Sequence, residues 1–307
     1  MTRRSRHDRI AVVIPVHNRG DELGRALRSL RIQSDRDLQI VICDDGSTED
    51  IAPFVDEFRS ELDLRVLRIP RSGGPARPRN VAIDAIDADW ISFLDSDDEW
   101  FSGKVEAIRG MIAAGADVIY HRLIVRHAIA GGTSPRDRRR SVGCPLRGPS
   151  AVVSMVRYGN PLATSGTTVR REMLLHHGKF CEDPDLQGVE DFDLWFRLAG
   201  AGARFSFIPS TLGAYWVHSG SISTRDHAAY RRHVALFGRQ VRHVEERYRR
   251  LAESSSQYRL GMLADQLGLD EAREHFLRVK LLQNPLYWLR ARARAASRAL
   301  HAPARRS

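Results

Sequence analysis

The sequence predicts an α/β fold with a mostly parallel, doubly wound sheet, and three observations lead to this prediction. Short β-rich apolar runs alternate with segments of helical spacing over the first 120 residues. Clusters of polar side chains follow four of the predicted strands. Hydrophobic residues make up 42% of the 307 positions, which is enough for one large domain or for one domain plus an appendage.

The elements of the first half follow one another in a regular order. Helices are expected where apolar residues recur at spacings of three and four, and strands where the apolar run is short. Ser47, with Asp50 three residues later, has the spacing of a helix N-cap and its capping-box partner. In chain order, the prediction is a strand at 9–16, a helix at 21–33, strands at 38–47 and 64–70, a helix at 78–86, a strand at 89–95, a helix at 102–114 and a strand at 116–123.

The second half is mixed and ends in helices. Residues 130–150, which are rich in Gly, Pro, Ser and Arg, are expected to form a loop. From Asp226 onward the pattern is helical throughout. The predicted elements are a strand leading into a helix at 165–178, a helix at 188–202, one or two strands at 204–223, and amphipathic helical stretches at 236–253 and 262–282.

The net charge of +10 is carried by the end of the chain. Residues 225–307 contain 18 Lys and Arg against 8 Asp and Glu, whereas residues 1–224 contain 30 of each sign. The arginines near the end accompany an aromatic and aliphatic group in the stretch 284–307. Such a helix can lie on an anionic membrane, or it can pack on the protein with its arginines in water. Both interpretations stay open, and nucleic-acid binding is not expected because no motif for it is found.

The location is predicted from cysteine usage and from the lack of long apolar runs. Cys43, Cys144 and Cys181 match neither a zinc site nor a disulfide framework, which favours a reducing cytoplasm. No apolar run approaches the roughly 18 to 20 residues that span a bilayer, and the basic N-terminus lacks a cleavage site. A cytoplasmic protein is expected, with peripheral attachment to the inner face of the plasma membrane as the open alternative.

The stretch "ISFLDSDDEW" (91–100) places four acids directly after a buried strand. Ligands of doubly wound sheets bind beyond the carboxyl ends of the strands, where this cluster is expected. Side chains two apart on a strand point the same way, so Asp95 and Asp97 are expected to face one point. Carboxylates held that close repel unless a cation lies between them. Oxygen ligands from one short segment suit Mn²⁺ or Mg²⁺, against the alternative of a solvated acidic turn.

Five stretches in order resemble the inverting glycosyltransferases of family 2, which have the GT-A fold. They are "VVIPVHNR" (12–19), "VICDDGSTED" (41–50), "GGPARPRNVAIDAIDADWISFLDSDD" (73–98), "GVEDFDLWFRL" (188–198) and "YWVHSGSIS" (215–223). The resemblance implies a nucleotide-sugar donor and a Mn²⁺ or Mg²⁺ cofactor. It also implies a catalytic domain at 1–224, with a nucleotide-binding half at 9–123 and an acceptor half at 150–224, followed by a basic helical extension at 225–307.

The resemblance also implies a role for particular residues. Asp191 matches the general base, which removes a proton from the acceptor hydroxyl, with Glu190 as the second choice. Asp97 is the principal metal ligand, and Asp95 and His218 are further candidates, with Asp98 assisting. The residues expected to hold the nucleotide are Pro15, Val16, His17, Arg19, Asp45, Arg79 and Asp95.

Several side chains near these motifs have alternative interpretations. Asp193 and Arg197 lie four apart on the predicted helix and are expected to pair with each other. Trp100 and Trp195 are placed in the core, with stacking on a sugar as the alternative. Trp216 stands where family members often have a basic residue, which puts the acceptor contacts in doubt.

The sequence therefore predicts transfer of a sugar from a nucleotide diphosphate, with UDP as the first candidate, to a glycan or lipid-linked acceptor in cell-surface polysaccharide biosynthesis. Two alternatives remain. A nucleotidyltransferase would need a Gly-rich, basic segment after the first strand, and "IPVHNRGDE" lacks one. A non-catalytic module that binds nucleotide sugars or membranes is disfavoured because both acidic groups are present.

Overall fold

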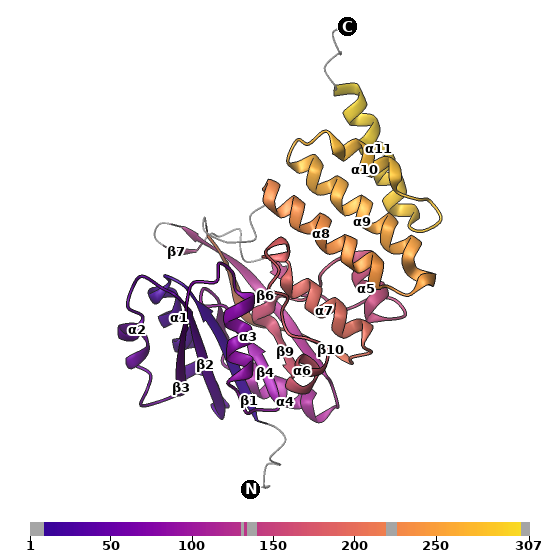
Figure 1. The fold of residues 1–307 in the computed structure, drawn as a ribbon. Coiled ribbons are helices and arrows are strands. Elements are labelled where there is room, and N and C mark those ends of the chain that lie inside the picture. Colours follow the sequence, from indigo (N-terminus) through magenta and orange to yellow (C-terminus); the bar gives the residue numbers. More distant parts are fainter. Residues whose placement is uncertain (1–8, 130–131, 134–139, 219–225, 302–307) are drawn as a thin grey trace. The chain divides into compact units, whose positions relative to one another are not determined.

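The computed structural model describes residues 9–129, 132–133, 140–218 and 226–301, and the chain divides into two compact units (Figure 1). Parts of the expected loop at 130–150, of the motif at 215–223 and of the basic end of the chain lie outside the described residues. The first unit consists of residues 1–146 and 160–221, and the second of residues 147–159 and 222–307. The second unit thus takes in a short segment that the sequence analysis placed with the acceptor half.

The first unit is built on one mixed sheet with the strand order β3-β2-β1-β4-β9-β6-β10-β5. β3, β2, β1 and β4 are parallel, and β10 is parallel to β6. The predicted α/β class with a mostly parallel sheet is therefore confirmed. The strands are β1 (Ile10–Val16), β2 (Leu38–Asp45), β3 (Asp63–Ile69), β4 (Trp90–Phe93), β5 (Glu99–Trp100), β6 (Val118–Ile129), β7 (Gly132–Thr133), β8 (Ser141–Val142), β9 (Thr167–Arg170) and β10 (Phe205–Val217).

The helices of this unit pack on the sheet through apolar stripes. Leu23, Leu27 and Leu30 of the first helix are buried and belong to one cluster with Val12 and Ile14 of β1. Their spacing of three and four places them on one face of the helix, while alternate residues of the strand point to that same side. The helices are α1 (Gly20–Arg31), α2 (Ala52–Asp56), α3 (Ala76–Asp84), α4 (Lys104–Ala113), α6 (Arg171–His176) and α7 (Glu190–Gly200).

One strand runs against the others in the middle of the sheet. β9 lies between β4 and β6 and is antiparallel to both, with Ser92 opposite Thr168. Its beginning therefore lies at the edge where the parallel strands end, and so does the 3₁₀ turn Thr164–Gly166 that precedes it. This reversal brings Ser165 to the predicted ligand edge. The sequence analysis did not specify the direction of β9.

Two local predictions differ from the structure. The expected N-cap at Ser47 is wrong, because α2 begins at Ala52 and the Ser47 hydroxyl instead accepts a hydrogen bond from the Asn18 N–H at 2.9 Å. The segment 130–150 is not only loop, because its described part contains β7 and β8, both antiparallel to β6. Both differences arise from contacts between segments distant in sequence, which local patterns do not encode.

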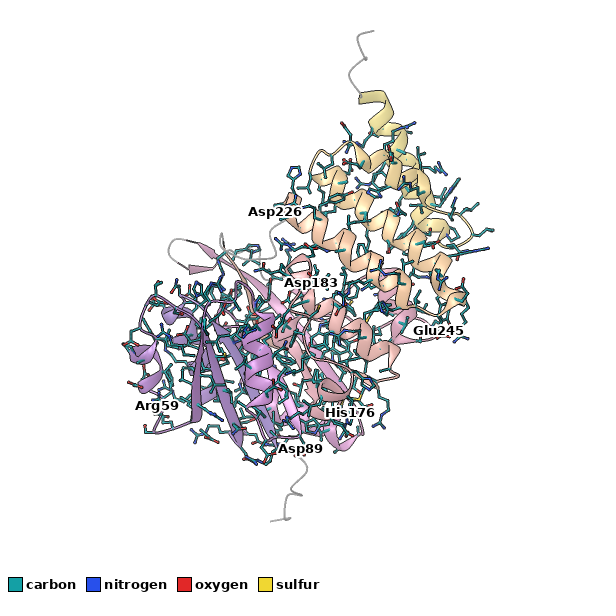
Figure 2. All side chains as sticks on the ribbon, viewed as in Figure 1. Arg59, Asp89, His176, Asp183, Asp226 and Glu245 are labelled. Carbon is teal, nitrogen blue, oxygen red and sulfur yellow. The ribbon has the colours of Figure 1, made fainter. Side chains whose placement is uncertain are left out.

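The second unit is helical, as predicted for the end of the chain. Asp226, labelled in Figure 2, caps α8 (His227–His243) by accepting a hydrogen bond from the Ala229 N–H at 2.6 Å. The predicted stretch 236–253 is broken in two, because Val244 and Glu245 adopt extended backbone angles. Among the described helices, none is long and apolar enough to span a bilayer. The helices are α5 (Ala151–Tyr158), α8 (His227–His243), α9 (Glu246–Gln266), α10 (Glu271–Arg278) and α11 (Pro285–His301).

Candidate active site

The carboxylate of Asp45 at the end of β2 is held by the loop that follows β3. Its Oδ1 accepts a hydrogen bond from the Ser72 N–H at 2.7 Å, and its Oδ2 accepts one from the Arg71 guanidinium. Gly46 allows this approach, because its φ is 66° and a Cβ there would lie 2.7 Å from the Arg71 nitrogen. Asp45 is buried, and each of its oxygens accepts one hydrogen bond from this loop, which leaves a lone pair on each for a further donor.

The loop after β1 lies against the same residue. Pro15 and Val16 are buried in the strand, and the His17 ring hydrogen-bonds through Nδ1 to the Asp45 carbonyl oxygen at 3.0 Å. Asn18 has a φ of 49°, in the left-handed region, and its side-chain oxygen accepts the Thr48 N–H at 2.8 Å. Four of the residues predicted to line a nucleotide pocket are therefore neighbours at one edge of the sheet, namely Pro15, Val16, His17 and Asp45.

Arg79 on α3 connects two acidic groups that are far apart in the sequence. Its guanidinium donates to Asp95 Oδ1 at 2.5 Å and to Glu190 Oε1 at 2.8 Å, and its side chain is 4% exposed. Burial alone would lower the pKa of the guanidinium, but the charges of Asp95 and Glu190 outweigh it and hold the pKa above its ordinary value. Arg79 is thus a fixed cation that balances carboxylates from both halves of the sheet.

The acids after β4 lie in a turn and not on the strand. β4 ends at Phe93, and the Asp98 N–H donates to the Asp95 carbonyl at 3.0 Å. Asp95 and Asp97 were expected to face one point because of their alternation on a strand. This expectation is wrong, because neither residue belongs to β4. Asp95 contacts Arg79, whereas Asp97 Oδ2 contacts the Arg19 guanidinium and lies 2.9 Å from His218 Nε2.

Asp98 is the buried member of this turn and holds it in place. Its carboxylate accepts hydrogen bonds from the Ser165 hydroxyl at 2.5 Å and from the Trp216 N–H at 2.9 Å. Burial raises the pKa of Asp98 well above its ordinary value, and the charges of Asp97 and Asp95 raise it further. Because Trp216 is two residues before His218, this contact brings the end of β10 within reach of Asp97.

Asp97 and His218 are suitable ligands for a divalent ion. Among the residues that the structure describes, no group of three or more His, Cys, Asp or Glu side chains is arranged to hold a metal ion by itself. A single carboxylate with an imidazole nevertheless fits Mn²⁺ or Mg²⁺ when phosphate oxygens and water complete the coordination. The donor set therefore fits a metal shared with a diphosphate. A metal role for Asp95 stays a prediction, because its side chain contacts Arg79.

The second acidic group lies at the start of α7. Glu190 is buried, and both of its oxygens have strong partners, Arg79 on Oε1 and the Gly188 N–H on Oε2 at 2.5 Å. Asp191 is partly exposed, and its Oδ2 has only longer contacts, to Asn160 Nδ2 at 3.3 Å and to the Thr164 hydroxyl at 3.2 Å. Of the two carboxylates, Asp191 is the one with an oxygen available to a substrate.

The electrostatic surroundings of Asp191 suit a general base. Burial raises its pKa from 3.8 to about 7, and the neighbouring Glu190 charge adds to this effect. Arg79 and the hydrogen bonds from the Phe192 N–H and Thr164 oppose the rise. A carboxylate with a pKa near neutrality can accept a proton during a reaction and release it afterwards.

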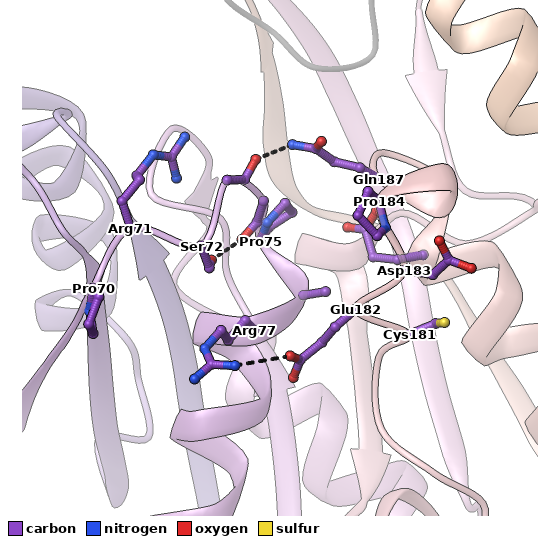
Figure 3. A pocket seen from close by; sticks show the side chains of 14 residues that line it. Pro70, Arg71, Ser72, Pro75, Arg77, Cys181, Glu182, Asp183, Pro184 and Gln187 are labelled. Carbon is purple, nitrogen blue, oxygen red and sulfur yellow. Dashed lines mark hydrogen bonds and ion pairs between the residues drawn. The ribbon is translucent and has the colours of Figure 1, made fainter.

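A pocket of about 470 Å³ opens beside these groups (Figure 3). Its two walls are the loop 70–77 and the segment 181–187, and Glu190 also lines it. Arg77 and Glu182 point toward one another from the two walls, with 3.6 Å between Nη1 and Oε2. The pocket adjoins the Asp45 site, because Arg71 and Ser72 line it and also hold the Asp45 carboxylate.

Comparison with known proteins identifies the family. The profile described as "Glycosyl transferase family 2" matches residues 11–172, more than half of the chain. The chain belongs to glycosyl transferase family 2. A relative, the pre-mycofactocin glycosyltransferase of Mycobacterium tuberculosis, is 31% identical over 215 residues, which cover 68% of this chain and 43% of the relative. The chain thus spans less than half the length of that relative.

Solved structures share the fold of this family 2 glycosyltransferase. TarS residues 1–349 of Staphylococcus aureus, solved with UDP, align with a TM-score of 0.63 and 21% identity over 92% of this chain and 78% of that chain. The mannosyltransferase PcManGT of Pyrobaculum calidifontis, solved with GDP-Man and Mn²⁺, aligns with a TM-score of 0.59 and 18% identity over 96% of this chain and 81% of that chain. At these identities the likeness concerns the fold.

Several side chains of this glycosyltransferase site were not anticipated from the sequence. Ser165 donates to Asp98, accepts the Asp95 N–H at 3.0 Å, and through its carbonyl accepts the buried ammonium of Lys104 at 3.0 Å. Arg71 was missed in the same way. The polar run "TSGTT" at 164–168 is a signal for Ser165 only once β9 is known to be antiparallel.

Other side chains near the family motifs have structural roles. Trp100 and Trp195 are fully buried, as expected for core residues. Asp193 accepts a hydrogen bond from Arg197 Nε at 2.9 Å, so the predicted pair is confirmed. The Arg25 guanidinium lies over the Trp216 ring, with 4.5 Å between its central carbon and the ring centre. A contribution of Trp216 to acceptor binding stays a prediction.

Proposed function

We propose that this glycosyltransferase is an inverting, metal-dependent enzyme that transfers a sugar from a UDP-linked donor to a glycan or lipid-linked acceptor. The observation that carries the proposal is the pair of separate acidic groups at one sheet edge. Asp97 with His218 forms the first, and Asp191 with a pKa of about 7 forms the second. Arg79 links the two groups through Asp95 and Glu190.

The two groups divide the reaction between them. Asp191 takes the proton from the acceptor hydroxyl while that oxygen attacks the anomeric carbon and the bond to the diphosphate breaks. A single displacement of this kind inverts the configuration at the sugar carbon. Asp97 and His218 would hold a divalent ion, which would supply positive charge to the leaving diphosphate. Glu190 keeps Arg79 in place and takes no part in proton transfer, because both of its oxygens are bound.

The donor base is assigned from the chemistry around Asp45. Its carboxylate accepts hydrogen bonds, and the Arg71 guanidinium beside it donates them. Such a pair matches an N–H next to a C=O, the edge that uracil, thymine and guanine share and that adenine and cytosine lack. We assign UDP within this group, and the TarS neighbour solved with UDP supports the choice.

The acceptor is proposed at the level of its class. The poly(ribitol-phosphate) β-N-acetylglucosaminyltransferase TarS of Staphylococcus aureus is 33% identical over 93 residues, 29% of this chain and 16% of that protein. The similarity to an enzyme that acts on poly(ribitol-phosphate) supports a role in cell-surface polysaccharide biosynthesis for this chain as well. We propose that the reaction takes place on the cytoplasmic side of the membrane, where nucleotide sugars are the donors.

A panel of nucleotide sugars tests the proposal. The purified chain is incubated with UDP-, TDP-, GDP- and CDP-linked sugars, with Mn²⁺ or with a chelator, and released nucleoside diphosphate is measured. We expect release from UDP sugars in the presence of Mn²⁺ and none with the chelator. Release that is unchanged by the chelator would contradict the metal assignment, and no release from any donor would contradict transfer itself.

A further inference from the structure

Exposed leucines gather in one short part of the second unit. Among the residues that the structure describes, nine large hydrophobic side chains are exposed, and five of them are leucines between positions 277 and 289. Leu282 is the most exposed, at 91%. An exposed apolar group of this size usually marks a surface that another molecule covers. We call the following five residues the leucine patch: Leu277, Leu281, Leu282, Leu286 and Leu289.

The backbone on which the patch lies is fixed, so its leucines cannot turn inward. Phe276 and Val279 are buried in the core of the second unit. The Lys280 N–H donates to the Ser254 hydroxyl of α9 at 2.9 Å, and the Asn284 side chain caps α11 through the Tyr287 N–H at 3.2 Å. The residues between the leucines therefore anchor the end of α10, the turn 279–284 and the start of α11.

The aromatic residues of this segment face the opposite way. Tyr287 stacks on Tyr258 of α9, with 4.2 Å between the ring centres. Trp288 packs against the same core cluster. In the stretch 284–307, these two aromatic rings therefore pack on the core of the second unit and are not available to a membrane. The side chains left for a partner are the leucines and the cations beside them.

The segment that carries the leucine patch is positively charged. Residues 275–307 contain no Asp or Glu, whereas they contain eight Lys and Arg. Lys280 and Arg290 are exposed, and neither has a carboxylate partner within the described residues. Arg292 donates to the Leu277 carbonyl at 3.3 Å, which places a further cation beside the patch. Arg294 and Arg298, by contrast, pair with Asp265 of α9 and belong to the fold.

We propose that the leucine patch and its flanking cations, Lys280, Arg290 and Arg292, form a docking surface for an anionic phospholipid bilayer. Protruding leucines enter the boundary between headgroups and acyl chains, and neighbouring cations bind the lipid phosphates. A second copy of the chain fits less well, because it would bring the same positive charge against this one. This surface attaches the second unit to the membrane.

Vesicle sedimentation of the full chain tests this inference. The vesicles are phosphatidylcholine alone or phosphatidylcholine mixed with phosphatidylglycerol. We expect binding to the mixed vesicles that weakens as salt is added. The double variant Lys280→Gln with Arg290→Gln should bind about thirtyfold more weakly, at about fivefold for each cation. The double variant Leu282→Ser with Leu286→Ser should lose at least about tenfold, even at low salt.

Matched variants separate the patch from general effects. Arg247→Gln with Arg249→Gln removes the same charge from α9, and Ile32→Ser with Leu175→Ser removes exposed apolar groups from the first unit. Both controls should bind as the parent chain does, and thermal unfolding of all variants checks that they fold. Equal losses in controls and patch variants would overturn the inference, as would equal binding to both vesicle types. A leucine variant that changes the oligomeric state but not vesicle binding would instead assign the patch to a second copy.

Discussion

Replacing Asp191 by asparagine should abolish transfer and yet stabilise the fold at pH 8. The pKa of Asp191 is raised from 3.8 to about 7 by burial and by Glu190. Between pH 3.8 and about 7, Asp191 is protonated in the folded chain and ionised in the unfolded chain. The stability of the fold therefore falls as the pH rises through this range, and the loss is complete above about pH 7. At about 1.4 kcal/mol for each pKa unit the full effect is about 4 kcal/mol. Because Asp191 is partly exposed, we expect a gain of about 1 to 3 kcal/mol in the asparagine variant.

The assays are thermal unfolding and the pH dependence of kcat/KM. The stability gain should be present at pH 8 and vanish below about pH 4, where aspartate is neutral in both folded and unfolded chains. In the parent chain, kcat/KM should fall about tenfold for each pH unit below about 7, because the base must be deprotonated. Both curves report the same group by independent means.

Asp193→Asn is the matched control on the same helix. Asp193 pairs with Arg197 at 2.9 Å, so its replacement should lower stability by about 1 kcal/mol and leave the pH profile unchanged. The distinctive result is that the change in stability at pH 8 has opposite signs in Asp191→Asn and Asp193→Asn. A loss of stability at pH 8 in Asp191→Asn, or a pH profile that is flat through 7 in the parent chain, would refute the reasoning.

Three further predictions concern two cations of the site, Arg79 and Arg71, and the carboxylate of Asp45. Arg79→Leu leaves the buried carboxylate of Glu190 and the partly buried one of Asp95 without their shared partner. It should destabilise the fold by about 3 to 5 kcal/mol in denaturant unfolding, whereas a neutral effect would show that the bridge is dispensable. Arg71→Gln should weaken UDP binding at least about fivefold in calorimetry with little change in thermal stability, because Arg71 is half exposed; unchanged affinity would remove it from base recognition. Asp45→Asn should reduce discrimination between UDP and CDP in the same assay, and a preserved ratio would count against the base assignment.

The sequence predicted the fold class because the information for it is local. Apolar runs and helical spacing lie within single segments, and alternation of strands with helices is enough to indicate a parallel sheet. The positions of Asp45, Asp97 and Asp191 at one edge follow from that sheet, since ligand groups gather at the ends of its strands. The antiparallel direction of β9 has no local signal, and with it the contacts of Ser165 were missed.

The pairing within the site was also beyond the sequence. Arg79 and Glu190 are 111 residues apart, and Asp97 and His218 are 121 apart, so their contacts depend on the completed sheet. The role of Ser47 was misjudged because a capping-box spacing occurs equally well in a loop that binds another segment. The different roles of Glu190 and Asp191 also depend on the completed fold, because Arg79 forms its ion pair with the Glu190 carboxylate and not with that of Asp191.

Asp97 is proposed to hold the metal ion and Asp191 to accept the proton. Calorimetry of UDP binding tests this division of tasks. Binding is measured with and without Mn²⁺ for the parent chain, for Asp97→Asn and for Asp191→Asn. The account predicts that Mn²⁺ strengthens UDP binding in the parent chain and in Asp191→Asn but not in Asp97→Asn. Equal loss of the Mn²⁺ effect in both variants, or a parent chain that binds UDP identically with and without Mn²⁺, would contradict it.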